Sequence, residues 1–157
     1  MSIARVGSDA DLLAIRELFL EYAASLDVDL AYQDFSREVA ELPGEYAAPR
    51  GCLFIATSGN RSVGCVAVRP ADGDNCEMKR LYIRPAARGS GLGELTAESA
   101  IAFARAAGYR AMRLDTGFLN SEALTLYAGL GFHERDAYAD YPPQIAVHLR
   151  FMERPLP

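Results

Sequence analysis

Residues 76–106 contain the pattern that most constrains how this chain can fold: an apolar segment of β type, three closely spaced glycines and a long helical repeat. The glycines Gly89, Gly91 and Gly93 occupy alternate positions at the start of the helical repeat. The first backbone N–H groups of a helix have no partner within it, and they lie at the positive end of its dipole. Glycines let an anion approach those groups, and Arg88 adds a cation at the same place. The stretch therefore predicts a diphosphate site at a helix N-terminus.

Two common phosphate-binding motifs compete for this interpretation. A kinase-type P-loop is excluded, because no Gly-Lys-Ser/Thr follows the glycines. A Rossmann site is a closer competitor, since Asp115 lies about 22 residues beyond Gly93, where a ribose-binding acid would sit. The third glycine of that motif, however, would fall at Glu94, and residues 84–88 separate the strand from the first glycine.

The segment Arg88-Gly-Ser-Gly-Leu-Gly93 resembles the Arg/Gln-x-x-Gly-x-Gly/Ala signature of the GNAT superfamily of N-acetyltransferases, which bind acetyl-CoA. Further matches follow in the family's order: a strand at 77–83, a strand at 111–116, the segment Asn120-Ser-Glu-Ala-Leu-Thr-Leu-Tyr127, and Gly131-Phe132. The resemblance covers roughly residues 52–134. It implies an α/β fold with a mixed, mostly antiparallel central sheet of about six or seven strands, flanked by about four helices.

Length and composition agree with an ordinary globular chain. The 157 residues predict one domain, residues 1–157, and half of them are hydrophobic. A net charge of −5 argues against a nucleic-acid partner, and neither a membrane span nor a secretory signal is recognisable. Three cysteines, an odd number without metal-ligand spacing, predict buried free thiols in a reducing cytoplasm and no metal site. The sequence leaves the oligomeric state open, a homodimer included.

Periodicity and turn residues predict the remaining elements. A strand at 3–6 precedes a helix capped by Ser8 or Asp9, and a second helix runs from Asp34, its expected N-cap, to Glu41. The other expected elements are strands at 52–57, 63–68 and 146–151, helices at 92–106 and 121–129, and a loop at 138–144 before the last strand.

The resemblance implies how the chain would hold acetyl-CoA. The backbone amides of Arg88, Gly89, Ser90, Gly91, Leu92 and Gly93 would bind the diphosphate. The backbone of Leu81, Tyr82 and Ile83 would pair with pantetheine as an added strand, and the Leu81 N–H would bind the oxyanion. Asn120 would bind the pantetheine amides, with a simple helix cap as its competing role.

Two side chains are candidates for proton transfer. Glu77 lies eleven residues before Arg88, as does the catalytic glutamate in the histone-acetylating branch of the family, and burial is expected to raise its pKa towards that of a general base. The alternative is a surface or ion-paired acid next to Lys79. Tyr127 follows Asn120 by seven residues on the same helix face and is the candidate acid for the CoA thiolate, with core packing as its alternative.

The sequence says less about the acceptor. Asp27 and Asp29 are candidates to meet an ammonium group, although helix-capping acids in a loop are the simpler interpretation. Tyr138 and Tyr141 flank a segment that lines the acceptor pocket in GNAT folds, whereas His133, on an edge strand, and His148, within the last strand, are not expected to act in catalysis. We therefore expect acetyl transfer from acetyl-CoA to a primary amine, of a small or amino-acid-like molecule, by direct transfer in a ternary complex. A non-catalytic acyl-CoA-binding module and a protein acetyltransferase are the alternatives.

Overall fold

The structure is a computed structural model, and it describes residues 1–26, 29–117 and 120–157. Its strands form one seven-stranded sheet in the order β1-β2-β3-β4-β5-β7-β6. The strands are β1 (Ser2–Arg5), β2 (Cys52–Ser58), β3 (Arg61–Pro70), β4 (Asn75–Ile83), β5 (Ala111–Gly117), β6 (His133–Arg135) and β7 (Leu149–Pro155). Neighbouring strands are antiparallel except β4 and β5, so the sheet is mixed and mostly antiparallel, as predicted.

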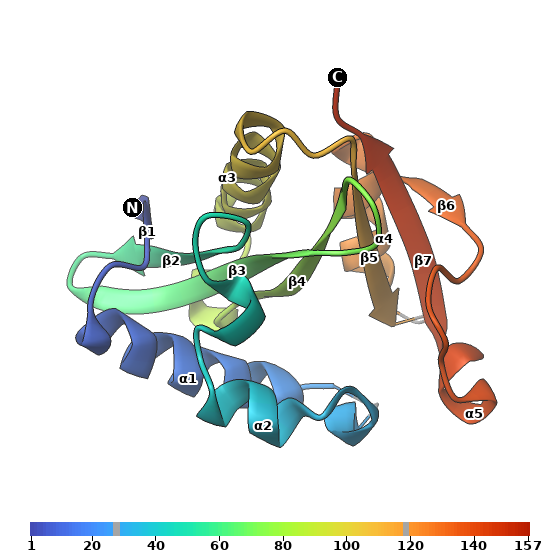
Figure 1. The fold of residues 1–157 in the computed structure, drawn as a ribbon. Helices are drawn as coiled ribbons and strands as arrows, with labels where there is room; N and C mark the ends of the chain where they lie inside the picture. The colour runs from blue at the N-terminus through green and yellow to red at the C-terminus, as the bar shows by residue number, and fades with distance from the viewer. Residues whose placement is uncertain (27–28, 118–119) are drawn as a thin grey trace.

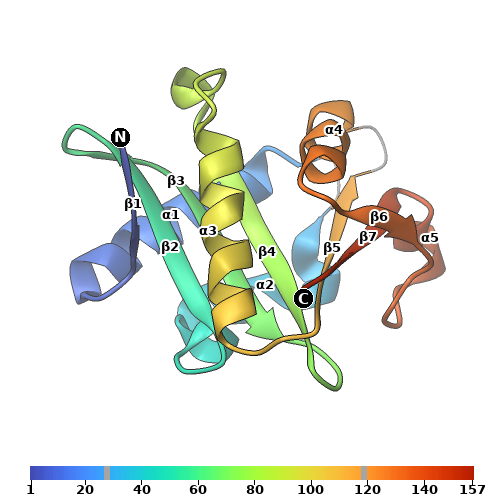
Figure 2. The ribbon, with the colours of Figure 1, turned by 90° about the horizontal axis from the view of Figure 1, so that it is seen from above.

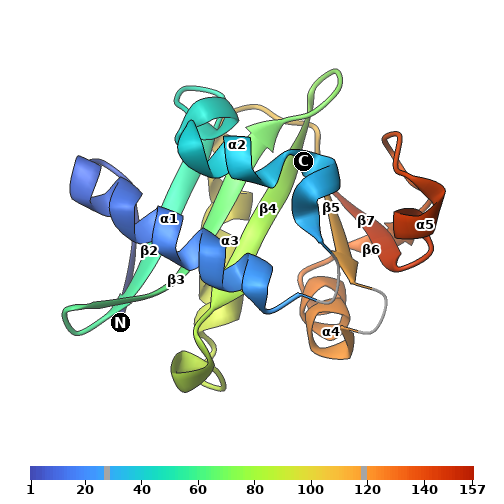
Figure 3. The same ribbon diagram turned by 90° about the horizontal axis from the view of Figure 1, so that it is seen from below.

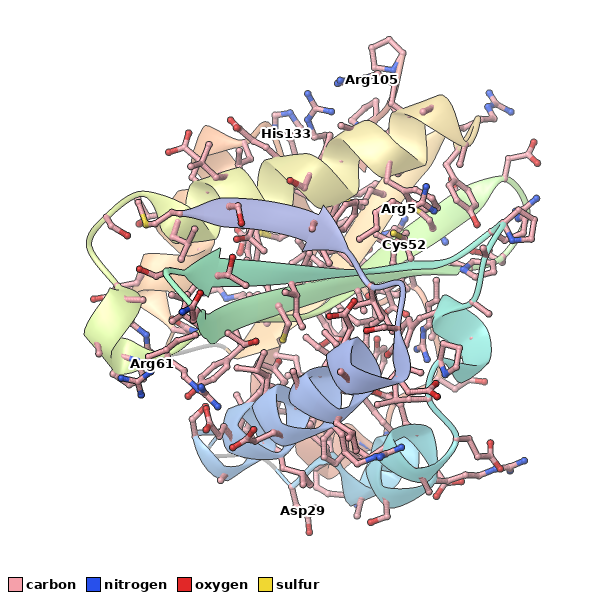
Figure 4. All side chains as sticks on the ribbon, turned by 90° about the vertical axis from the view of Figure 1, so that its left-hand side faces the viewer. Arg5, Asp29, Cys52, Arg61, Arg105 and His133 are labelled. Atoms are coloured by element: carbon pink, nitrogen blue, oxygen red, sulfur yellow. The ribbon has the colours of Figure 1, made fainter. Side chains whose placement is uncertain are left out.

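Helices cover both faces of this sheet (Figure 1). The described residues form α1 (Asp9–Ala24), α2 (Phe35–Ala40), α3 (Leu92–Ala106), α4 (Ser121–Gly129) and the short α5 (Pro143–Ala146). Figure 4 shows α3 on one side of the sheet and α1 with α2 on the other. Each face buries its own apolar cluster, because side chains of a regular strand alternate between the two faces.

The parallel pair β4–β5 is short. Its residue partners are Asn75–Ala111, Cys76–Met112 and Glu77–Arg113, and no further pair joins the two strands in the described residues. Beyond Glu77 the strands diverge, as Figures 2 and 3 show from the two sides of the sheet. This divergence leaves the facing edges of β4 and β5 without a strand neighbour.

A β-bulge interrupts β4 where it leaves β5. Cys65 of β3 opposes Tyr82 and Ala67 opposes Lys79, so the single residue Val66 faces both Arg80 and Leu81. Arg80 has φ of 61°. Such a value is rare for a residue with a side chain. The strand predicted at 77–83 is therefore correct in position but not regular.

Several predicted boundaries are confirmed, and the bounds of the last strand are wrong. Ser8 caps α1 by accepting from the Asp11 N–H at 3.1 Å, and α3 ends before Gly108, which has φ of 87°. Asp34 is the N-cap of α2, as predicted, but its side chain makes no cap hydrogen bond. The predicted last strand exists, but its bounds of 146–151 are wrong: α5 occupies Pro143–Ala146, and β7 runs from Leu149 to Pro155, where its pairing with β5 ends.

Candidate active site

A cavity of about 970 Å³ lies between the diverging edges of β4 and β5. The end of α1 and the starts of α3 and α4 complete its walls. It brings together all the predicted cosubstrate residues except Ser90: Leu81, Tyr82, Ile83, Arg88, Gly89, Gly91, Leu92, Gly93, Asn120 and Tyr127. The Ser90 hydroxyl instead donates to the Ala87 carbonyl at 2.9 Å. The cavity volume falls in the range typical of small-ligand sites.

The glycine loop presents free backbone donors to this cavity. Gly89 and Gly91 have φ of 82° and 80°, and Gly91 is the N-cap of α3. Glycine adopts this conformation without strain. Within the described residues, no acceptor contacts the backbone N–H groups of residues 89–94. A Cβ added to either glycine would meet no atom of the chain within 4 Å, so the space beside the loop is open to a ligand. These donors fit a diphosphate.

Arg88 connects this loop to the end of β4. Its Nε donates to the Ile83 carbonyl at 2.8 Å, and its Cζ lies 5.8 Å from the centre of the Tyr82 ring. Arg88 therefore lines the cavity while fixing the path of the loop, a second role that the sequence did not indicate.

Tyr127 and Asn120 reach the cavity from α4. Tyr127 is buried, and its ring packs edge-to-face on Phe132 with centroids 5.8 Å apart. Burial, with the nearby charge of Asp115, raises the pKa of Tyr127 well above its usual value, so its hydroxyl keeps its proton at neutral pH. Asn120 caps α4, its Oδ1 accepting from the Ala123 N–H at 3.2 Å, and it also lines the cavity. The cap and a ligand contact are thus compatible.

Glu77 differs from the expectation for a general base. It is buried but does not line the cavity, and Arg69 pairs with its Oε1 at 2.8 Å. Burial alone would raise the pKa of Glu77, but the charges of Lys79 and Arg69 and a hydrogen bond from Tyr138 outweigh it and lower the pKa. The expected upward shift is therefore wrong, and the ion-paired alternative describes this side chain.

Asp115 is a carboxylate that does line the cavity, as do Glu94 and Glu122 at the starts of α3 and α4. The Asp115 Oδ2 lies 3.7 Å from the Lys79 Nζ and accepts a hydrogen bond from the Tyr141 hydroxyl at 3.0 Å. The Lys79 Nζ also donates to Gln33 at 2.8 Å and lies 3.8 Å from Glu77. Both Asp115 and Lys79 line the cavity. The sequence analysis assigns Asp115 only the role of a ribose-binding acid in a Rossmann site. Its position as a charged residue within an apolar strand is the sequence feature that could have indicated a role in the site.

The remaining candidate residues divide between the cavity and the surface. The Tyr138 hydroxyl donates to Glu77 at 2.6 Å, so Tyr138 holds the segment before α5 against the sheet. His148 precedes β7 rather than lying within it, and it lines the cavity. Asp29 caps a short 3-10 helix through the Ala31 N–H at 2.9 Å, and Figure 4 shows it at the outer edge of the molecule; Asp27 lies outside the described residues. His133 is exposed on the edge strand β6, as expected.

The described residues contain neither a candidate metal site nor a helix that could span a membrane. No group of three or more His, Cys, Asp or Glu side chains is placed to hold a metal ion. None of the helices in residues 1–26, 29–117 and 120–157 has the length and apolar character needed to cross a membrane. Cys52, Cys65 and Cys76 are all buried free thiols, as predicted.

Comparison with known proteins identifies the family to which this arrangement belongs. Residues 12–132 match the family model described as the acetyltransferase (GNAT) family. The chain is a GNAT acetyltransferase. A relative described as an uncharacterized N-acetyltransferase of Schizosaccharomyces pombe is 36% identical over 152 residues. The matched region covers 96% of this chain and 93% of the relative's length.

Solved GNAT structures share the fold. A candidate acyl-CoA N-acyltransferase of Klebsiella pneumoniae has a TM-score of 0.73 and 31% identity, covering 99% of this chain and 97% of its own. The PaiA N-acetyltransferase of Thermoplasma acidophilum, solved with coenzyme A, has the same TM-score at 18% identity and covers 99% of both chains. The GNAT chain described here is therefore an acyltransferase.

Proposed function

We propose that this enzyme transfers the acetyl group of acetyl-CoA directly to the primary amine of a small, amino-acid-like acceptor, with both substrates bound at once. One observation carries the proposal: the free N–H groups at the start of α3, the open edges of β4 and β5 and the Tyr127 side chain all meet at one cavity. A single continuous space suits direct transfer, because the two reacting groups can meet without a covalent enzyme intermediate.

In the proposed reaction, the neutral amine nitrogen attacks the thioester carbonyl carbon. The C–N bond forms, the negative charge on the carbonyl oxygen is bound by the Leu81 N–H, and the C–S bond then breaks. The CoA thiolate takes its proton from the Tyr127 hydroxyl, and the nitrogen loses one proton to a carboxylate, directly or through water. The tyrosinate is reprotonated from solvent.

Two carboxylates are candidates to receive the amine proton. Glu77 is the sequence candidate, but Arg69 and Lys79 pair with it; Asp115 lines the cavity. The kcat values of Glu77→Gln and Asp115→Asn, measured with the same amine, distinguish them. We expect Asp115→Asn to lower kcat by about 10²-fold or more and Glu77→Gln to lower it less. If Glu77→Gln alone lowers kcat, Glu77 is the base; if neither does, the proton leaves by another route.

The size and chemistry of the cavity favour a small acceptor. On the α1 side it is bounded by Tyr22, Leu26 and Leu30. Its charged side chains there include the buried Lys79 and Arg80 and the partly buried Asp115. Release of free thiol from acetyl-CoA across a panel of small amines, amino acids and lysine-containing peptides tests this proposal. Turnover with peptides alone would favour a protein acetyltransferase. Binding of acetyl-CoA without turnover on any amine would favour a non-catalytic acyl-CoA-binding module.

The compartment is also part of the proposal. Three buried free thiols suit a reducing environment, so we place the enzyme in the cytoplasm. Fractionation of the source cells tests this placement.

A further inference from the structure

We propose that Cys65 and the Arg80–Glu38 ion pair together position the Leu81 N–H in the cavity, so that Cys65, Arg80 and Glu38 are positioning residues for acetyl transfer. The proposal rests on the proposed function, in which this N–H binds the carbonyl oxygen of the thioester. It names the side chains that fix the direction of that donor at the bulge of β4.

The first observation concerns the peptide unit between Arg80 and Leu81. The buried Cys65 thiol of β3 donates to the Arg80 carbonyl, with Sγ 3.4 Å from the oxygen. The bond between Arg80 and Leu81 is trans, and a trans peptide points its C=O and N–H in opposite directions. The Leu81 N–H therefore points away from the Cys65 thiol. Cys65 belongs to β3, whereas the cavity that Leu81 lines lies on the other side of β4, between β4 and β5.

The second observation concerns the conformation of Arg80 itself. Arg80 has φ of 61°. This region costs about 1 kcal/mol or more for a residue with a Cβ, so the surroundings of Arg80 must hold it there. Glu38 of α2 does so with two bonds of 2.9 Å, from Nε and Nη2 of Arg80. Nη2 also donates to Gln33 at 2.9 Å, and the guanidinium lies 5.1 Å from the centre of the Phe35 ring.

The third observation is that the thiol is suited to this task. Cys65 is fully buried, and burial raises its pKa far above the usual value, so it stays protonated and can donate. Cys76 is equally buried in β4 but lies before the bulge, at the pairing with Met112. Cys76 therefore provides a matched control for the loss of a buried sulfur.

The test measures the hydrogen bond to the thioester directly. Acetyl-CoA labelled with ¹³C at the acetyl carbonyl is bound to the intact enzyme, and its carbonyl stretching band is recorded by difference infrared spectroscopy. A hydrogen bond to the oxygen lowers this frequency. We expect a downshift in the wild type that is reduced in Cys65→Ala and Glu38→Gln, and retained in Cys65→Ser, Cys76→Ala and Glu41→Gln. Glu41 pairs with Arg37 on the exposed side of α2, so its variant controls for loss of a charge beside that helix.

Kinetics provide the second measurement. Cys65→Ala and Glu38→Gln should lower kcat by about tenfold to hundredfold, part of the loss typical for one oxyanion donor, with little change in the KM for acetyl-CoA. Cys65→Ser should restore most of kcat, because a hydroxyl also donates. Equal kcat and equal band positions in Cys65→Ala and Cys76→Ala would overturn the proposal.

Failure of the proposed function and failure of this proposal give different results. Absence of acetyl-CoA binding to the wild type, seen as no change in its melting temperature and no bound carbonyl band, would sink the proposed function itself. Binding with an unshifted band in the wild type would sink the role of the Leu81 N–H. If Cys65→Ala is too unstable to study, the band positions of Cys65→Ser and Glu38→Gln decide. Cys65→Ser should show the wild-type downshift, and Glu38→Gln should lose it.

Discussion

Arg80 is the residue whose place in the sheet the strand pattern does not reveal. Strict alternation would send Lys79 and Arg80 to opposite faces, yet both donate to Gln33 on the face covered by α1 and α2. The bulge makes this possible by adding one residue to β4. The adjacent cations Lys79 and Arg80 in an apolar strand indicate that β4 is irregular. The position of the bulge, however, depends on the pairing with β3 and on the contact of Arg80 with Glu38.

Tyr127 gives the most direct prediction at this scale. Tyr127→Phe removes the hydroxyl but keeps the ring against Phe132, so the fold should be retained. We expect kcat to fall about 10²-fold, the effect typical of a general acid, with little change in acetyl-CoA affinity. Steady-state kinetics and titration calorimetry measure the two quantities. A fully active variant would remove Tyr127 from the mechanism.

Glu77 gives a prediction about stability. Its pKa is lowered in the folded state, so its carboxylate stabilises the fold above the unfolded pKa of about 4.3, and this contribution disappears as pH falls through the folded pKa. Glu77→Gln leaves Arg69 and Lys79 without their buried partner and should cost about 3 kcal/mol at pH 7.

Urea unfolding of the wild type and of Glu77→Gln between pH 7 and pH 3 measures this difference. The gap in unfolding free energy should be complete at pH 7 and should close below about pH 4. A gap that does not change over this range would contradict the role assigned to the charge of Glu77.

The turn between β4 and α3 is the element that the sequence predicts best. Its glycines and its helix start are determined by local chemistry, so periodicity and turn residues suffice. The last strand was predicted less well, because its ends depend on pairing with β5, which is distant in the sequence. The same holds for the candidate site. The backbone donors of the glycine loop were predictable from local sequence, but the place of Asp115 in the cavity and the bulge in β4 depend on how the strands pair in the sheet.

A substitution in the glycine loop tests whether this loop binds the diphosphate of acetyl-CoA. Gly91→Ala places a Cβ at a positive φ, which costs about 1 kcal/mol, on the loop that presents the free N–H groups. Gly59, in the turn between β2 and β3, has φ of 61° and equally open surroundings, so Gly59→Ala is a matched control. Both variants should melt at lower temperature, and only Gly91→Ala should raise the KM for acetyl-CoA. An equal KM in both would contradict the diphosphate site.

At the scale of the whole molecule, the sheet consists of two parts joined at a narrow contact. β1 to β4 form one part and β5 to β7 the other, and three residue pairs connect them in the described chain. The fold class was predictable because residues 52–134 resemble the GNAT superfamily. The length of the parallel pair β4–β5 was not, since no local pattern specifies where two strands separate.

Amide hydrogen exchange tests how acetyl-CoA acts on these two parts. If pantetheine pairs with the open edge, acetyl-CoA should slow exchange in peptides containing residues 79–83 and 114–117. Peptides from β2, which has neighbours on both sides, should exchange at an unchanged rate. Uniform protection of all strands would indicate general stabilisation instead.

The early separation of β4 from β5 has one more consequence. Two neighbouring strands that separate within a sheet offer unpaired backbone N–H and C=O groups to an extended molecule whose amides are spaced like those of a strand. Pantetheine without its nucleotide is such a molecule, so it should compete with acetyl-CoA even though it cannot reach the glycine loop. Coenzyme A fragments thus become tools for measuring how much each half of the donor contributes to binding.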